Sequence, residues 1–101
     1  MPLKKINGSE IEYNMTEQIT IVNFYANWCG PCKMMIPVFE EIATQDGITV
    51  LKVDIDHNRE FAQKYGVKGI PATFVYKNKQ LKFQETGYMP KTALTEKIAK
   101  I

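Results

Sequence analysis

The chain has few of the residues that organise metal-bound and disulfide-rich small proteins. Its 101 residues include two cysteines and one histidine. A structural zinc site usually takes about four such ligands. Cys29 and Cys32 could supply half of one, but there is no second cysteine pair and His57 is the only histidine. The sequence therefore predicts that no metal is bound, and two cysteines are too few for a disulfide-rich scaffold.

Long apolar runs are also absent. The first residues, MPLKK, are followed by no apolar stretch long enough for a signal peptide, and no window approaches the length of a membrane span. We therefore expect a cytoplasmic protein that does not contact a membrane. Because thiols are kept reduced in that compartment, a lone pair of cysteines favours catalysis, redox sensing or metal binding over a structural role.

Charge of one sign is nowhere concentrated. The formal net charge is +2, and residues 52–101 carry 10 Lys and Arg against 5 Asp and Glu, a net of +5. This excess is spread over several predicted elements without a basic run, so it indicates a solvated surface, and we expect no binding to nucleic acid. With 45% apolar and 24% charged residues, residues 1–101 are expected to form a single soluble domain.

Strand and helix patterns alternate along most of the chain. Runs of β-branched and aromatic residues predict strands at residues 3–6, 19–26, 48–55, 72–76 and 81–86. Helical patterns begin at a capping box over Ser9–Glu12, span residues 31–46 and 57–65, and begin again at Pro90. This order predicts an α/β fold: a three-layer sandwich in which four helices cover a central mixed five-stranded sheet.

The two cysteines lie where a predicted buried strand ends and a helix begins. Unpaired amides and the positive end of the helix dipole favour an anion there, so a thiolate at Cys29 is expected to be stabilised. Cys32 lies about one helical turn further on, within reach of the sulfur of Cys29. The spacing predicts that Cys29 attacks a substrate disulfide and that Cys32 resolves the mixed disulfide. Gly30 leaves room for a partner, and Pro31 fits the first turn of a helix.

Three other interpretations of the cysteine pair remain: half of a zinc site, a structural disulfide, and two cysteines that are close by chance. A disulfide closing so short a loop removes little chain entropy, and the cytosol would tend to reduce it. The position between strand and helix favours redox chemistry.

The segment from Trp28 to Lys33, WCGPCK, resembles the active-site signature of the thioredoxin family. The resemblance covers nearly the whole chain, including residues 24–43, residues 52–80, the region of Gly87 and the last helix. It implies the thioredoxin fold and a protein dithiol-disulfide oxidoreductase. The Gly-Pro pair between the cysteines is similar to that of the members that reduce disulfides.

The resemblance also implies residues that support the cysteines. Ile70 and Pro71 match the loop in which the family holds a cis proline beside the sulfurs, where the backbone of Ile70 could pair with an extended substrate. The implied surface that receives protein disulfides is apolar and consists of Trp28, Gly30, Pro31, Ile70, Pro71 and Gly87. A core position is the alternative for Trp28, and a plain turn before the last helix is the alternative for Gly87.

Asn23 departs from the family. It occupies the position of a buried aspartate that is paired with a lysine, matched here by Lys52, and to which the family assigns proton transfer to and from the resolving cysteine. An amide cannot titrate. We therefore expect the reaction to persist with a different pH dependence, with Cys32 deprotonated by water or by the leaving sulfur. Lys52, without its partner, is expected to extend toward solvent.

The resemblance implies a general protein-disulfide reductase that binds no cofactor, because the Cys29–Cys32 pair carries the electrons. Its implied partners are protein disulfides and a thioredoxin reductase, expected to be a flavoenzyme drawing on NADPH, and the protein is expected to be monomeric. One alternative is a binding or regulatory module that docks partners on the same apolar face, with or without redox control. Another is a dedicated reductant for a single enzyme.

Overall fold

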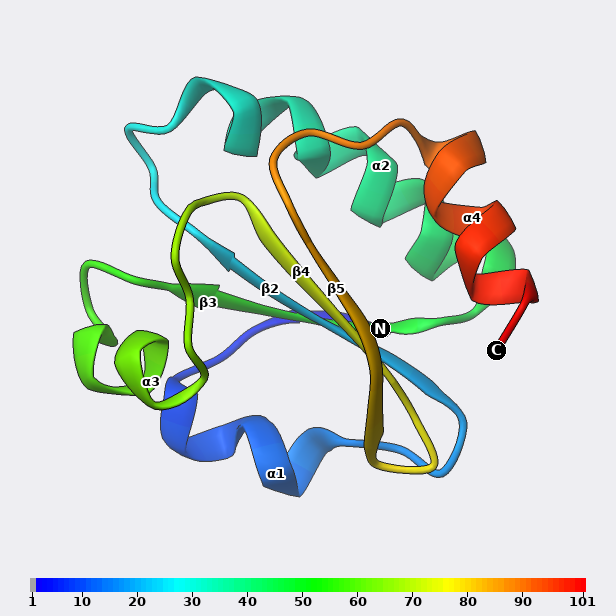
Figure 1. Ribbon diagram of the computed structural model, residues 1–101, viewed down its shortest axis with the longest axis horizontal. Helices are drawn as coiled ribbons and strands as arrows, with labels where there is room; N and C mark the ends of the chain where they lie inside the picture. Colours follow the sequence, from blue (N-terminus) through cyan, green and yellow to red (C-terminus); the bar gives the residue numbers. More distant parts are fainter. Residues whose placement is uncertain (1) are drawn as a thin grey trace.

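Five strands form one mixed sheet at the centre of the molecule (Figure 1). The computed structural model describes residues 2–101. The strands are β1 (Leu3–Lys5), β2 (Ile19–Tyr25), β3 (Thr49–Asp54), β4 (Ala72–Lys77) and β5 (Gln80–Thr86). They lie in the order β1-β3-β2-β4-β5, with β1, β3 and β2 parallel and with β4 antiparallel to both β2 and β5. The prediction of a mixed five-stranded sheet is confirmed.

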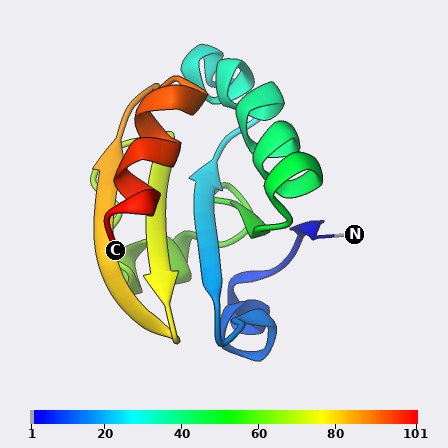
Figure 2. The same cartoon turned by 90° about the vertical axis from the view of Figure 1, so that its right-hand side faces the viewer.

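Helices cover both faces of this sheet, as predicted (Figures 1 and 2). They are α1 (Ile11–Asn14), α2 (Gly30–Asp46), α3 (Arg59–Lys64) and α4 (Lys91–Ala99), and a 3-10 turn, η1 (Gly8–Glu10), leads into α1. Residues of α2 and α4 pack in an apolar cluster on one face of the sheet. Residues of α1 and α3 pack in a second apolar cluster on the other face. The molecule is therefore the expected three-layer sandwich.

The side chains of β2 alternate between the two faces of the sheet, and this alternation determines which of them lie under α2. Ile21 packs in the cluster with α2, whereas Val22 and Phe24 pack in the cluster with α1 and α3. Because successive side chains of a strand point to opposite faces, Asn23 is on the same face as Ile21. The polar interruption of the buried strand therefore faces the layer that contains α2.

A 3-10 turn at Gly8–Glu10 precedes the first α-helix, and its N-cap is Asn7, so the predicted capping box at Ser9–Glu12 is wrong. The backbone N–H of Asn7 donates to Oε1 of Glu10 at 2.9 Å. The backbone N–H of Gly8 donates to Oδ1 of Asn58 at 2.8 Å, which ties this turn to the start of α3. The chain thus enters the helix through a 3-10 turn that the tertiary contact with Asn58 stabilises.

The third helix begins at Arg59, two residues after its predicted start at residue 57. His57 Nδ1 donates to Oδ2 of Asp54 at 3.2 Å, and Asn58 Nδ2 donates to the backbone oxygen of Asp54 at 2.9 Å. Both side chains are therefore used to close the turn that follows β3, and the helix starts only after them.

Candidate active site

Cys29 and Cys32 are joined as a disulfide at the start of α2. Cys29 is the N-cap of the helix, with an extended backbone, and its Sγ accepts a hydrogen bond from the backbone N–H of Cys32 at 3.2 Å. Gly30 and Pro31 form the first turn of the helix. Apart from its chain neighbours and the backbone of its own helix, no atom of residues 2–101 lies within 4 Å of the place where a Cβ of Gly30 would stand, so the backbone is open to an approaching chain. Figure 2 shows β2 pointing toward the loop that leads into this helix.

Both sulfur-bearing residues are nearly buried, at 5% exposure each. They form a small apolar cluster with Ala26, against which Tyr25, Ile55 and Ile70 pack. This low exposure restricts access to the disulfide. A substrate must therefore approach over the residues that surround it.

A second chain segment reaches the same place from the entrance to β4. The Ile70–Pro71 peptide bond is cis, and Ile70 packs on the cysteine cluster. The backbone N–H of Gly87, at the exit of β5, donates to the Pro71 oxygen at 2.8 Å. Gly87 has a φ of 98°, a conformation that favours glycine. The structure thus brings Ile70 to the cysteines and ties Gly87 to Pro71.

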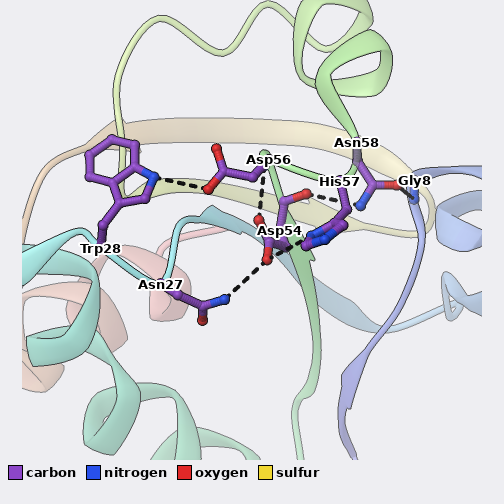
Figure 3. Close-up of polar contacts among 7 residues, drawn as sticks. All are labelled: Gly8, Asn27, Trp28, Asp54, Asp56, His57 and Asn58. Carbon is purple, nitrogen blue, oxygen red and sulfur yellow. Dashed lines mark hydrogen bonds and ion pairs between the residues drawn. The ribbon is translucent and has the colours of Figure 1, made fainter.

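Trp28 lies at the surface beside the cysteines, with 69% of its area exposed, so a core position is excluded. Its indole Nε1 donates to Oδ2 of Asp56 at 2.9 Å (Figure 3). Asn27 Nδ2 likewise donates to Oδ2 of Asp54 at 3.3 Å, and Oδ1 of Asp54 accepts from the backbone N–H of Asp56 at 2.9 Å. These bonds hold the loop before the cysteines against the loop that follows β3.

Sequence reasoning did not single out Asp54 and Asp56. Their signal was weak: two acidic residues spaced by one position at the end of a buried strand. Their partners lie 27 and 28 residues earlier in the chain, and only the parallel pairing of β2 with β3 brings them together.

Asn23 is buried under the helix, at 1% exposure. Its Nδ2 donates to the backbone oxygen of Ala72 at 3.2 Å and more weakly to that of Phe24 at 3.4 Å. Its strand neighbours are Lys52 on β3 and Thr73 on β4, so three polar residues form a row across the sheet. The amide side chain therefore links β2 to the backbone of β4 without adding a charge.

Lys52 is buried at 5% exposure, so the expectation that it extends toward solvent is wrong. Its Nζ lies 4.6 Å from the centre of the Tyr25 ring, where the cation meets the negative face of the aromatic ring. Burial lowers the pKa of Lys52 below its ordinary value, and nearby Lys5 adds to the effect while Glu40 opposes it. Lys52 and Cys32 line the same pocket, whose volume is about 300 Å³.

Thr73 is a further residue that the sequence pattern did not identify. It is fully buried, and its Oγ1 has no hydrogen-bond partner among residues 2–101. A buried hydroxyl without a partner costs about 1–3 kcal/mol of desolvation. Replacing it with valine, which has nearly the same shape, is expected to raise the free energy of unfolding by about 1 kcal/mol. Urea denaturation would measure the change.

Thr20→Val is the matched control for Thr73→Val. Thr20 is equally buried, but its Oγ1 accepts the Thr16 backbone N–H at 3.0 Å and lies 3.1 Å from the Thr16 hydroxyl. This variant is expected to lose about 1 kcal/mol of unfolding free energy, because the half-buried backbone N–H of Thr16 would lose its acceptor. Equal losses in both variants would contradict the interpretation of Thr73.

Neither a metal site nor a membrane-spanning segment is found in the part of the chain that the structure describes. Within residues 2–101, no three His, Cys, Asp or Glu side chains are grouped so that they could hold a metal ion. None of the helices in the same range combines the length and apolar character needed to cross a bilayer.

Known proteins resemble this chain over nearly its full length. The family model for thioredoxin matches residues 4–100. A thioredoxin from Rhodospirillum rubrum is 46% identical over 98 residues, covering 93% of this chain and 94% of that protein. A thioredoxin from Bacillus subtilis is 37% identical over 102 residues, covering 99% and 98%.

The structural likeness is equally extensive. A solved mutant thioredoxin from Halobacterium salinarum NRC-1 matches with a TM-score of 0.90 at 31% identity, covering 97% of this chain and 88% of that one. The mixed sheet with helices on both faces is therefore the thioredoxin fold. With the Cys29–Cys32 pair at the start of α2, these matches show that the chain belongs to the thioredoxin family, as a dithiol-disulfide oxidoreductase.

Proposed function

We propose that Cys29 is the attacking thiolate and Cys32 the resolving thiol. The observation that carries this assignment is the N-cap position of Cys29, where Sγ accepts the Cys32 backbone N–H at 3.2 Å. After reduction, the same N–H and the positive end of α2 would stabilise a thiolate on Cys29. Cys32 lies inside the first turn, and within residues 2–101 no hydrogen bond to its Sγ is found, which supports its role as the second thiol.

The proposed reaction proceeds in two exchanges. The Cys29 thiolate attacks one sulfur of a substrate disulfide, forming a mixed disulfide and releasing the other sulfur as a thiolate. Cys32 then loses its proton and attacks Sγ of Cys29. The Cys29–Cys32 bond forms, the bond to the substrate breaks, and the second substrate sulfur leaves. Two electrons pass from the cysteine pair to the substrate, so no bound cofactor is required.

Protein substrates are proposed to bind on the apolar surface around the disulfide, formed by Trp28, Gly30, Pro31, Ile70, Pro71 and Gly87. Support comes from the exposed Trp28, from the contact of Ile70 with the cysteine cluster, and from the hydrogen bond that ties Gly87 to Pro71. The backbone of Ile70 would pair with an extended substrate as a short added strand. Asn23 and Lys52 would support the cysteines from beneath.

The family implies protein disulfides as substrates and a reductase as the electron donor. More specifically, we propose that this reductase is a flavoenzyme drawing on NADPH, and that the protein acts as a monomer in the cytoplasm. The comparisons with known thioredoxins do not favour a protein-binding module without redox chemistry.

A coupled assay tests the proposed function. Insulin, NADPH and a purified thioredoxin reductase are mixed with the protein, and NADPH oxidation is followed by absorbance together with insulin precipitation. Both NADPH oxidation and insulin precipitation are expected. If the protein reduces insulin with dithiothreitol as the electron donor but with none of the reductases tested, this would indicate a specialised electron donor. If it reduces insulin neither with dithiothreitol nor with a reductase, this would contradict a general reductase.

A further inference from the structure

The resolving step requires a proton acceptor, and the structure lacks the carboxylate that would be the obvious one. Cys32 must lose its proton before it can attack Cys29, because only a thiolate is nucleophilic. The residue beneath the helix is Asn23, which cannot accept a proton at its amide. In the part of the chain that the structure describes, no Asp or Glu lines the pocket that reaches Cys32.

Four titratable side chains besides Cys32 line that pocket: Tyr25 of β2, Lys52 of β3, Lys5 of β1 and Lys33 of α2. Lys5 and Lys33 are exposed to solvent. Burial and the nearby Asp54 raise the pKa of Tyr25, so its phenol stays protonated at neutral pH. Lys52 is thus the one buried amine among them, and it has no carboxylate within ion-pair distance in residues 2–101.

We propose that Lys52 accepts the proton of Cys32 when the mixed disulfide is resolved, and returns it when the Cys29–Cys32 disulfide is reduced. This inference rests on the proposed roles of the two cysteines. Both residues line one pocket of about 300 Å³, which is large enough for water to carry a proton between Sγ and Nζ. The pocket also leads from the buried amine to the exposed lysines at its edge.

Each proton and electron is accounted for in this step. The Cys32 thiol gives its proton, through the pocket, to the neutral amine of Lys52, which becomes an ammonium. The thiolate attacks Sγ of Cys29, the new disulfide forms, and the substrate sulfur leaves with the electron pair and takes a proton from water. The ammonium later loses its proton to solvent. In the reverse direction, the ammonium protonates the Cys32 thiolate that leaves when the reductase attacks Cys29.

The environment of Lys52 supports a neutral amine as part of the cycle. Desolvation disfavours the charged form of a buried lysine, and Lys5 acts in the same direction. Glu40 opposes them and is exposed. The ring of Tyr25 stabilises the ammonium once it forms. Burial and Lys5 thus lower the pKa of Lys52 and favour the neutral amine more than solvent would, while the Tyr25 ring favours the ammonium.

The experiment separates the two thiol–disulfide exchanges with dithiobis(nitrobenzoate) as the substrate disulfide. Reduced protein and less than one equivalent of the reagent release one thionitrobenzoate when Cys29 attacks and a second when Cys32 resolves. Stopped-flow absorbance follows both phases between pH 6 and about pH 9. The variants are Lys52→Met and Lys52→Arg, because arginine keeps the charge but cannot act as a base. Lys33→Met is the matched control, which removes an exposed amine from the same pocket.

Both Lys52 variants are expected to slow the second phase by roughly 10²-fold near neutral pH, the lower range for general base catalysis, and to leave the first phase unchanged. In both variants the second phase should depend on the ionisation of Cys32 alone, so its rise with pH should be shifted to higher pH than in the wild type. Lys33→Met should match the wild type in both phases. Thermal unfolding of each variant shows whether it is folded.

Three results would overturn the inference. A Lys52→Arg variant with a wild-type second phase would show that only the charge matters, and unchanged kinetics in Lys52→Met would show that the amine is not used. The third is a wild-type protein that releases no first thionitrobenzoate, since this would remove the proposed function on which the inference rests. A fourth variant, Lys52→Met with Asn23→Asp, is expected to regain part of the second phase, because a carboxylate would replace the missing base.

Discussion

Replacing Cys29 with serine is expected to abolish disulfide reduction, with insulin turnover lowered by at least about 10³-fold. A serine hydroxyl does not ionise near neutral pH, and the N-cap hydrogen bond from the Cys32 backbone cannot make it a comparable nucleophile. The coupled NADPH and insulin assay measures the loss. The fold should be retained, because the side chain is small and lies at the start of a long helix.

Cys32→Ser distinguishes the two sulfurs. This variant should still attack a disulfide once through Cys29, but it cannot release the substrate. A stable mixed disulfide is therefore expected, and the mass of the intact protein would rise by that of one substrate thiol. If Cys29→Ser formed the stable adduct and Cys32→Ser did not, the proposed roles would be reversed.

The overall fold was predictable because its determining patterns are local. The apolar run in β2 and the stripe of Met35, Val38, Phe39, Ile42 and Ala43 in α2 each indicate their element and its buried face without knowledge of the rest of the chain. The order of strands and helices then limits the topology. The position of Cys29 at a helix start follows from the same two patterns, so the centre of the site was predictable too.

The parts that were not predictable depend on contacts between distant segments. Asn7 and Ser9 both begin a pattern with glutamate three residues later, and only the bond from Gly8 to Asn58 shows where the helix starts. The bond from Trp28 to Asp56 requires β2 and β3 to be adjacent. The burial of Lys52 depends on how α2 lies over β3.

Thr73 shows the same limit at the level of strand register. Its position opposite Asn23 is set by the antiparallel pairing of β4 with β2, and a shift of one residue would place it on the other face of the sheet. A sequence pattern identifies the strand but does not give this register. The polar row beneath the cysteines could therefore be seen only in the structure.

Phe24→Ala is expected to lower the free energy of unfolding by about 3–5 kcal/mol. Phe24 is fully buried beside Asn23 in β2, and its ring centre lies 5.6 Å from those of both Tyr65 and Phe74. The truncation would leave a cavity between the sheet and α3 and would remove two aromatic contacts. A domain of this size has roughly 5–15 kcal/mol of stability in total. The unfolding midpoint should therefore fall by about 12 °C or more, as measured by circular dichroism.

Tyr13→Ala is the control for Phe24→Ala, since it also removes an aromatic ring but one that is 89% exposed. Its stability should change by no more than about 0.5 kcal/mol. A loss below about 1 kcal/mol in Phe24→Ala would mean that the sheet closes over the cavity and that the three rings do not act as a unit. Because Phe24 adjoins Asn23, the rate of the second thionitrobenzoate phase in the folded fraction would also show whether this packing fixes the strand beneath Cys32.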